Sequence, residues 1–292
     1  MPRVASLALR LTLLLTAVPV IHAAEIKISK TAYEGREQFS VKTKSCTWVF
    51  DIAGGGFSQL LDSEGRDWIG FSKTPLSEFP QSAAAGYRGI PNCVFVGPDK
   101  GAGHPGFDQC TSRLVGSNRI VTESKSGKWK WQWTFHEQYA EFEILSAGES
   151  PWWFLYEGPP GGDYSPDKNY WGTDAMPQTR KMPANEEQRF GSWQTLYIGR
   201  DGQSQLLAIH QLQKDELADT LWFLGSENGG AADSKDGMIV VGFGRGPGTR
   251  PLLSGAGHKF RVGFVTAPEP AHEAILESIT RQLQLHAVER SK

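Results

Sequence analysis

The sequence contains no basic stripe and, after its first residues, no long apolar run. A membrane-spanning helix needs about 20 apolar residues, and a helix that lies on a membrane surface needs a polar face rich in Lys and Arg. We therefore expect no membrane insertion. Proteins that bind nucleic acid cluster Lys and Arg on one face, so nucleic acid is not an expected partner. The formal net charge of −2 agrees with this expectation.

Motifs that hold metals, cofactors or a nucleophilic serine are also missing. The spacings H-x-H, H-E-x-x-H and C-x-x-C do not occur, so a dedicated zinc site is unsupported. The stretches GGGFSQ (54–59) and GFGRGPG (242–248) do not lead into a helix with the required lysine and are not phosphate loops. The absence of G-x-S-x-G excludes the simplest serine hydrolase. We expect neither a metal nor a cofactor.

Cysteine is scarce, with three residues in the whole chain. Cys93 and Cys110 are the natural disulfide pair because they close a short loop, and Cys46 is then left over. A closed loop of this size contributes about 3 kcal/mol in the chain-entropy account of disulfides. Pairing of Cys46 with either partner stays open at this stage.

The first 23 residues have the order of a secretory signal peptide. Arg3 and Arg10 form a basic start, residues 11–21 form an apolar run, and small residues precede a cleavage site after Ala23. Removing the two arginines changes the formal net charge from −2 to −4. We therefore expect an exported protein, periplasmic or extracellular, in which residues 24–292 form a single domain.

Alternating segments, 33 glycines and 17 prolines are typical of β-structure. In KWKWQWTFH (128–136) the three tryptophans fall on one face, which predicts a half-buried strand whose tryptophans lie in the core. Residues 137–145 continue the same period and predict its antiparallel hairpin partner. Further strands are expected at residues 48–52, 57–61, 66–71, 151–158, 192–199, 204–212, 220–226, 238–244 and 258–266.

Only the C-terminal end is expected to form a long helix. Apolar residues recur there at helical spacing from Glu269 to about Val288. Residues 157–190 follow no period, and loops of that length in a compact domain are usually functional or disordered; their aromatic residues argue against disorder. We predict an all-β fold: a large β-sandwich of two antiparallel sheets, closed by a C-terminal helix.

The segment GGGFSQLLDSEGRDWIGF (54–71) resembles the opening of galactose-mutarotase-like supersandwich proteins, and HKFRVGFVTAPE (258–269) is similar to their last strand. The resemblance implies a carbohydrate ligand on the concave face of a sheet. Such proteins include sugar epimerases, central domains of polysaccharide lyases and sugar-binding domains, and the fold does not choose between them. The mutarotase His/His/Glu constellation matches no motif here, so the resemblance assigns no catalytic residue.

The segment YRGIPNCVFVGPDKGAGHPGFDQC (87–110) carries the first candidates for chemistry. His104 is suited to acid/base work near neutral pH, and Arg88 can grip a carboxylate through two parallel hydrogen bonds. Together they suit an acidic sugar, with Tyr87 and Asn92 as further contacts. The alternative is a surface loop in which Arg88 makes a structural ion pair.

A second group of candidates surrounds the irregular segment. Glu157 ends a predicted strand beside aromatic residues and is a candidate acid or base, although it could equally cap a turn or pair with an arginine. Tyr164 is a further candidate proton donor. Aromatic faces stack on sugar rings, so we expect a substrate-binding platform with Asp174 as a polar contact and with Trp152, Trp153, Tyr156, Tyr170 and Trp171 as its rings.

These observations predict an exported carbohydrate-active enzyme that works by acid/base chemistry at a sugar ring. The expected reaction is a lyase-type elimination or the cleavage of a glycosidic bond, with His104, Arg88 and Glu157 in the site. Two alternatives stay open: a non-catalytic carbohydrate-binding protein and a sugar epimerase of the mutarotase type. The sequence does not fix the oligomeric state.

Overall fold

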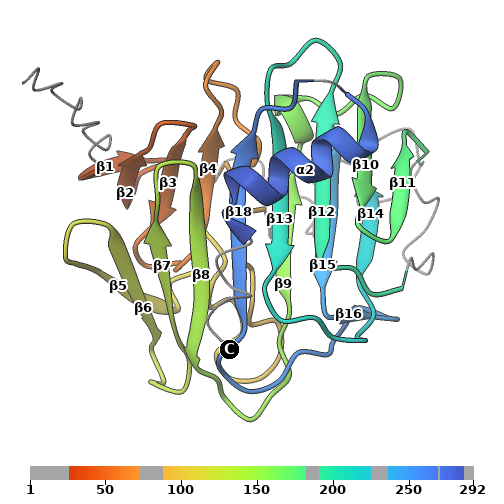
Figure 1. Cartoon of the computed structure of the whole chain (residues 1–292). Coiled ribbons are helices and arrows are strands. Elements are labelled where there is room, and N and C mark those ends of the chain that lie inside the picture. The colour runs from red at the N-terminus through yellow and green to blue at the C-terminus, as the bar shows by residue number, and fades with distance from the viewer. Residues whose placement is uncertain (1–25, 73–87, 182–190, 225–235, 269, 286–292) are drawn as a thin grey trace, which may run out of the picture.

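A computed structural model describes residues 26–72, 88–181, 191–224, 236–268 and 270–285. Its largest element is a nine-stranded antiparallel sheet (Figure 1). In spatial order the strands are β11 (Met176–Thr179), β10 (Asn169–Thr173), β12 (Thr195–Arg200), β13 (Leu206–Gln211), β18 (Lys259–Val265), β8 (Tyr139–Ser146), β7 (Lys130–Phe135), β6 (Arg119–Ser124) and β5 (Cys110–Val115).

The second layer consists of two smaller sheets rather than one large sheet. The four-stranded sheet has the order β1 (Lys27–Tyr33), β2 (Arg36–Lys42), β3 (Thr47–Asp51) and β4 (Phe57–Leu61). The three-stranded sheet has the order β14 (Thr220–Leu224), β15 (Met238–Phe243) and β9 (Phe154–Gly158). Two short elements remain: the 3-10 turn η2 (Pro160–Gly162) and the ribbon of β16 (Arg245–Gly246) and β17 (Arg250–Pro251).

Aromatic side chains join the two layers. Phe57 of β4 meets Trp133 of β7 with ring centroids 4.8 Å apart, and Phe154 of β9 stacks on Phe260 of β18 at 4.1 Å. The predicted core face of residues 128–136 is confirmed, because Trp129, Trp131 and Trp133 are all buried. The predicted all-β sandwich with a C-terminal helix is likewise confirmed.

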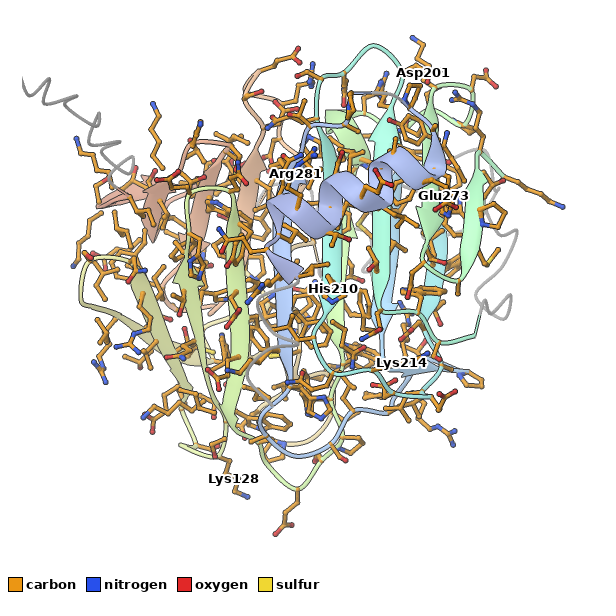
Figure 2. All side chains as sticks on the ribbon, in the orientation of Figure 1. Lys128, Asp201, His210, Lys214, Glu273 and Arg281 are labelled. Carbon is orange, nitrogen blue, oxygen red and sulfur yellow. The ribbon has the colours of Figure 1, made fainter. Side chains whose placement is uncertain are left out.

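Helix α2 (His272–Gln282) lies across the outer face of the nine-stranded sheet, over β18, β13 and β12 (Figure 1). Figure 2 shows Glu273 and Arg281 at its two ends, where an acidic and a basic side chain complement the helix dipole. The guanidinium of Arg261 binds the carbonyl oxygens of Leu283 and Gln284 at 2.8 and 2.9 Å, just past the helix end. The helix thus ends at residue 282 rather than near the predicted 288, and residues 269 and 286–288 of the prediction lie outside the described residues.

Two local predictions were wrong. Residues 66–71 form no strand and contribute only an isolated bridge between Asp67 and Leu61. The cause is Asp62, whose carboxylate accepts the backbone N–H of Arg66 and the indole N–H of Trp68 and so holds a turn. Residues 157–181 are also more regular than expected, since they contain η2, β10 and β11, and residues 182–190 lie outside the described residues.

Candidate functional site

Strand β9 divides its side chains between the core and the outer face of the three-stranded sheet. Phe154 and Tyr156 point toward the nine-stranded sheet and belong to the main core. Because side chains alternate along a strand, Trp153, Leu155 and Glu157 lie on the opposite face. Glu157 pairs with Val240 of β15, and Val240 pairs in turn with Trp222 of β14. One face of this sheet thus presents Glu157 and Trp222 in a single row.

Residues 89–93 run alongside β9 and extend this sheet. The backbones of Gly89 and Glu157 exchange two hydrogen bonds of 2.9 Å, and the N–H of Leu155 donates to the carbonyl of Pro91 at 2.8 Å. This pairing brings the loop that begins at Arg88 against the outer face of β9. The Nδ2 atom of Asn92 donates a hydrogen bond of 2.5 Å to Oε2 of Glu157.

A cavity of about 260 Å³ lies on this outer face. Four of its eight lining residues belong to this sheet or directly precede β9, two belong to the loop over residues 88–110, and two follow β15. The lining residues are Phe95, His104, Trp153, Leu155, Glu157, Trp222, Arg245 and Thr249. The structure therefore brings together two of the predicted catalytic residues, His104 and Glu157, with one predicted aromatic contact, Trp153.

Glu157 is held in an environment that favours its protonated form. Only 3% of the residue is exposed. Burial raises the pKa of its carboxyl group to about 8, against the opposing effects of the Arg245 charge, the Asn92 hydrogen bond and the Arg88 charge. Most Glu157 side chains therefore carry a proton at neutral pH, as a general acid requires.

His104 is held in the opposite protonation state. It is buried, its backbone N–H donates to the carbonyl of Gly101, and its ring lies 5.6 Å from that of Phe107. Burial lowers the pKa of the imidazole to about 3, and the nearby charge of Lys100 acts in the same direction. At neutral pH the cavity thus contains an uncharged imidazole beside a protonated carboxyl group.

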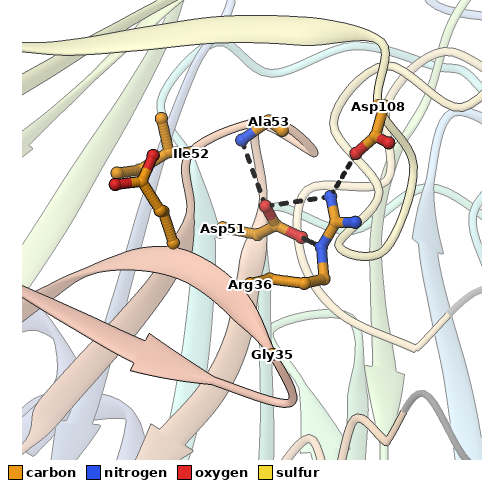
Figure 3. Close-up of a pocket in the computed structure, with 7 residues that line it drawn as sticks. Gly35, Arg36, Asp51, Ile52, Ala53 and Asp108 are labelled. Atoms are coloured by element: carbon orange, nitrogen blue, oxygen red, sulfur yellow. Dashed lines mark hydrogen bonds and ion pairs between the residues drawn. The ribbon is translucent and has the colours of Figure 1, made fainter.

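The buried carboxylate of Asp51, outside the cavity, fixes the segment that carries His104; Figure 3 shows its contacts with Arg36 and Ala53. The Oδ2 atom of Asp51 accepts the N–H of Gly106 at 2.8 Å, and its Oδ1 atom accepts the N–H of Gly54 at 3.1 Å. Arg36 binds Asp51 at 2.6 Å and reaches Asp108 at 2.7 Å. A Cβ atom on Gly54 would lie 2.5 Å from the carbonyl oxygen of His104, so only glycine permits this close approach.

Arg88 does not line the cavity. Its guanidinium makes two hydrogen bonds of 2.6 Å with the carboxylate of Asp236 and further bonds with the carbonyls of Ile69 and Gly70. This is the structural ion pair that the sequence left as the alternative. Tyr87 lies outside the described residues.

The other predicted platform residues also lie away from the cavity. Tyr156 points into the core and donates a hydrogen bond of 2.5 Å to the carbonyl of Trp68. Tyr164 packs in the main core against Phe223, with ring centroids 4.7 Å apart. Trp152 and Trp171 belong to the same core.

Tyr170 lies in strand β10 of the nine-stranded sheet, and Asp174 directly follows that strand. Tyr170 lines a different cavity, together with Arg200 and neighbouring residues. The exposed Asp174 accepts the backbone N–H groups of Gln194 and Thr195, both at 3.0 Å, and so connects two strands. The predicted aromatic platform is therefore reduced to Trp153.

The predicted disulfide between Cys93 and Cys110 is not formed, because these residues and Cys46 are buried free thiols. The thiol of Cys93 instead faces the carbonyl of Ala102 at 3.7 Å. Burial raises the pKa of Cys110 to about 12 and that of Cys93 as well. Disulfide exchange proceeds through the thiolate, which such burial disfavours.

Sequence reasoning missed Arg245, Trp222 and Phe95. Arg245 follows a buried strand and stands between two glycines in GFGRGPG, a signal that could have been used. Trp222 lies in a short apolar run, and the neighbouring residues do not indicate which face of the sheet its side chain occupies. Its place on the outer face follows only from its register with Val240.

Among the residues that the structure describes, no group of three His, Cys, Asp or Glu side chains is arranged to hold a metal ion. No helix among the same residues has the length and apolar character needed to cross a membrane.

The fold is similar to that of solved mutarotase-like proteins. The protein HI1317 matches with a TM-score of 0.51 and 13% identity over 87% of this chain and 98% of its own. A candidate mutarotase, YeaD from Salmonella typhimurium, matches with a TM-score of 0.50 and 9% identity over 84% and 97%. No family model and no curated protein sequence matches the chain. The predicted resemblance is thereby confirmed as a likeness of fold.

Proposed function

We propose that this protein is a carbohydrate-active enzyme that interconverts the anomers of a single sugar residue by acid/base chemistry. The observation that carries the proposal is that His104 and Glu157 line one cavity in opposite protonation states. The fold likeness to a candidate mutarotase supports the choice of this reaction over the others considered. It does so as an analogy of fold, since a fold hosts many activities.

Ring opening of a cyclic sugar needs one group that accepts a proton and one that donates a proton. The neutral imidazole of His104 takes the proton of the anomeric hydroxyl, and Glu157 gives its proton to the ring oxygen. The bond between the anomeric carbon and the ring oxygen then breaks, leaving an open-chain aldehyde. After rotation of the aldehyde group the ring closes and both protons return, so neither residue is changed overall.

The two transfers support one another electrostatically. When Glu157 gives up its proton it becomes an anion in the same cavity as His104. A nearby negative charge favours the protonated imidazole, so the basicity of His104 rises at the moment when it must accept a proton. The low pKa of His104 in the unliganded protein is therefore compatible with its role as a base.

The size of the cavity favours a single sugar residue over a polysaccharide chain. Its volume of about 260 Å³ lies just below the roughly 300–1,000 Å³ typical of pockets for drug-sized ligands. Trp153, Trp222 and Phe95 supply aromatic faces on which the C–H faces of a sugar ring can stack. Phe95 and Trp153 already lie 4.8 Å apart between ring centroids.

Lyase-type elimination is a second candidate reaction, and Arg245 is the observation that favours it. Elimination next to a carboxylate requires that the carboxylate charge be neutralised before a base removes the adjacent proton. Arg245 lines the same cavity as His104 and Glu157 and could supply that charge.

Reducing sugars incubated with the purified protein separate the candidates. Faster exchange between the α and β anomers, measured by exchange NMR or polarimetry, supports anomer interconversion. A rise in ultraviolet absorbance from an unsaturated sugar supports elimination. Saturable sugar binding without either reaction supports a binding protein and contradicts the proposed enzyme.

We also propose that the protein is exported to the periplasm or the cell exterior. The support is the signal-peptide pattern of residues 1–23. N-terminal sequencing of protein recovered outside the cytoplasm is expected to begin at Ala24. A mature chain that retains Met1 would contradict this proposal.

A further inference from the structure

A buried arginine forms part of the cavity wall beside the acid/base pair. Arg245 stands in β16, directly after the buried strand β15, and only 4% of the residue is exposed. Its guanidinium carbon lies 5.3 Å from the ring centroid of Trp153. The cavity therefore has a cation against one of its aromatic walls.

The sheet beneath Arg245 is shaped to receive this side chain. Gly242 occupies the outer face of β15 opposite Leu155. A Cβ atom at Gly242 would lie 2.8 Å from Cβ and 3.0 Å from Cδ of Arg245, so a larger residue would displace the arginine stem. The hydroxyl of Thr220 also donates to the backbone carbonyl of Arg245 at 2.8 Å. These contacts fix the root of the side chain, which lines the cavity.

The charges around the cavity favour an anionic ligand. Of the eight lining residues, Arg245 is the one that carries a full charge at neutral pH, since Glu157 is mainly protonated and His104 is neutral. A second cation stands at the same wall, because Nζ of the exposed Lys100 lies 5.1 Å from the ring centroid of Phe95. An uncharged sugar would leave both cations without a counterpart on the ligand.

We propose that the sugar bound in this cavity carries a carboxylate and that Arg245 is the residue that selects it. The inference rests on the proposed function for the identity of the ligand as a sugar. A guanidinium has five N–H donors in a planar fork and can bind a planar carboxylate through two parallel bonds while keeping its other contacts. The carboxylate is also the smallest of the common acidic sugar substituents, which suits a cavity of about 260 Å³.

This assignment moves the carboxylate-binding role from Arg88 to Arg245. Both side chains are buried, but the guanidinium of Arg88 is hydrogen-bonded to the carboxylate of Asp236 and does not line the cavity. Arg245 packs against Trp153, its charge acts on the carboxyl group of Glu157, and all three residues line the same cavity. A carboxylate bound to Arg245 would therefore place its sugar beside the proposed acid.

Binding measurements on matched ligands test the proposal. The ligands are a hexuronate, its uncharged methyl ester and the corresponding neutral hexose, titrated by calorimetry into the full mature chain. We expect the hexuronate to bind about 10- to 100-fold more tightly than the ester, as the loss of a charge-assisted pair implies. Arg245→Gln is expected to remove that preference, and Arg245→Lys to restore part of it.

The control is Arg113→Gln, which removes one exposed positive charge from β5 and is expected to leave every affinity unchanged. Equal binding of hexuronate and ester, or a preference that survives Arg245→Gln, overturns the inference. If neutral sugars are epimerised as fast as hexuronates, the inference fails while the proposed function stands. If hexuronate binds through Arg245 but no reaction occurs, the inference stands while the proposed function fails.

Discussion

The side chain of Asn92 donates a hydrogen bond of 2.5 Å to Oε2 of Glu157 and thereby joins the loop over residues 88–110 to strand β9. The bond links a residue held in the left-handed region, with φ of 46°, to a carboxyl group that is almost completely buried. It is one of the contacts that opposes the effect of burial on the Glu157 pKa. The protonation of the proposed acid is therefore adjusted by the loop that also carries the proposed base.

Removing the Asn92 side chain is expected to raise the pKa of Glu157 above its value of about 8. The reason is that the hydrogen bond favours the charged carboxylate, so its loss favours the protonated form. Asn92→Gly is the appropriate change because glycine accepts a positive φ without strain. Carboxyl NMR titration of Glu157 measures the shift, and an unchanged or lower pKa would contradict the assignment.

Glu157 is also expected to make the protein less stable as the pH rises. Its folded-state pKa lies above the ordinary value of 4.5, so the folded protein binds more protons than the unfolded chain between about pH 4.5 and 8. The stabilising contribution is fully present below pH 4.5 and is lost as the pH rises through 8. Thermal unfolding of Glu157→Gln should therefore show a smaller decline in Tm, by roughly a few degrees, from pH 5 to 8.

Part of that decline should persist in Glu157→Gln, since burial also raises the pKa of Asp219 to about 8. The exposed Glu149 provides the control: Glu149→Gln should leave the pH dependence as it is in the wild type. A Tm profile for Glu157→Gln that coincides with the wild-type profile would show that Glu157 is ionised in the folded protein.

Trp222 is expected to contribute to sugar binding, whereas Trp171 is not. Trp222 lines the cavity and is only partly buried, so Trp222→Ala should leave the fold intact and weaken sugar binding about tenfold through lost stacking. Trp171 is a core residue, and Trp171→Phe should lower Tm without changing affinity. Calorimetric titration distinguishes these outcomes, and equal losses of affinity in the two variants would argue against this cavity as the binding site.

Asp51 is expected to act as a positioning residue for His104. Asp51→Asn weakens the acceptor for the N–H of Gly106 and the pair with Arg36, so the segment around His104 should lose its fixed position. We expect kcat to fall about tenfold while KM changes little, because a misplaced base affects the chemical step more than binding. The matched control is Asp108→Asn, since Asp108 also binds Arg36 but is largely exposed. Equal effects of the two substitutions on kcat would assign Asp51 a role in stability alone.

The sequence predicted those parts of the fold that depend on local periodicity. The tryptophans of residues 128–136 alternate strictly, and a half-buried strand follows from that period alone. The strands at residues 204–212 and 238–244 were also predicted correctly. In β13 the core covers one face and α2 covers the other, so its residues do not alternate between apolar and polar. The strand expected at residues 66–71 was wrong because the side chain of Asp62 holds the backbone of Arg66 and the indole of Trp68, which no local period reveals.

The candidate site was predicted only in part because its contacts join distant parts of the chain. His104 and Glu157 were singled out by residue type and local context, and the structure places both in one cavity. Arg88 was assigned to the ligand because its partner Asp236 is 148 residues away and no local pattern reveals the pair. Arg245 and Trp222 enter the site through strand register, which a single sequence does not specify.

Exchange NMR between the α and β anomers of a hexuronate tests the central claim most directly. The proteins to compare are the wild type, His104→Gln, Glu157→Gln and the double variant, with His258→Gln as a histidine outside the cavity. We expect the wild type and His258→Gln to accelerate exchange equally, and each single cavity variant to lose at least about 100-fold. The double variant should be no slower than the slower single variant, because the two residues act as one unit. Wild-type exchange rates in either His104→Gln or Glu157→Gln would contradict the account.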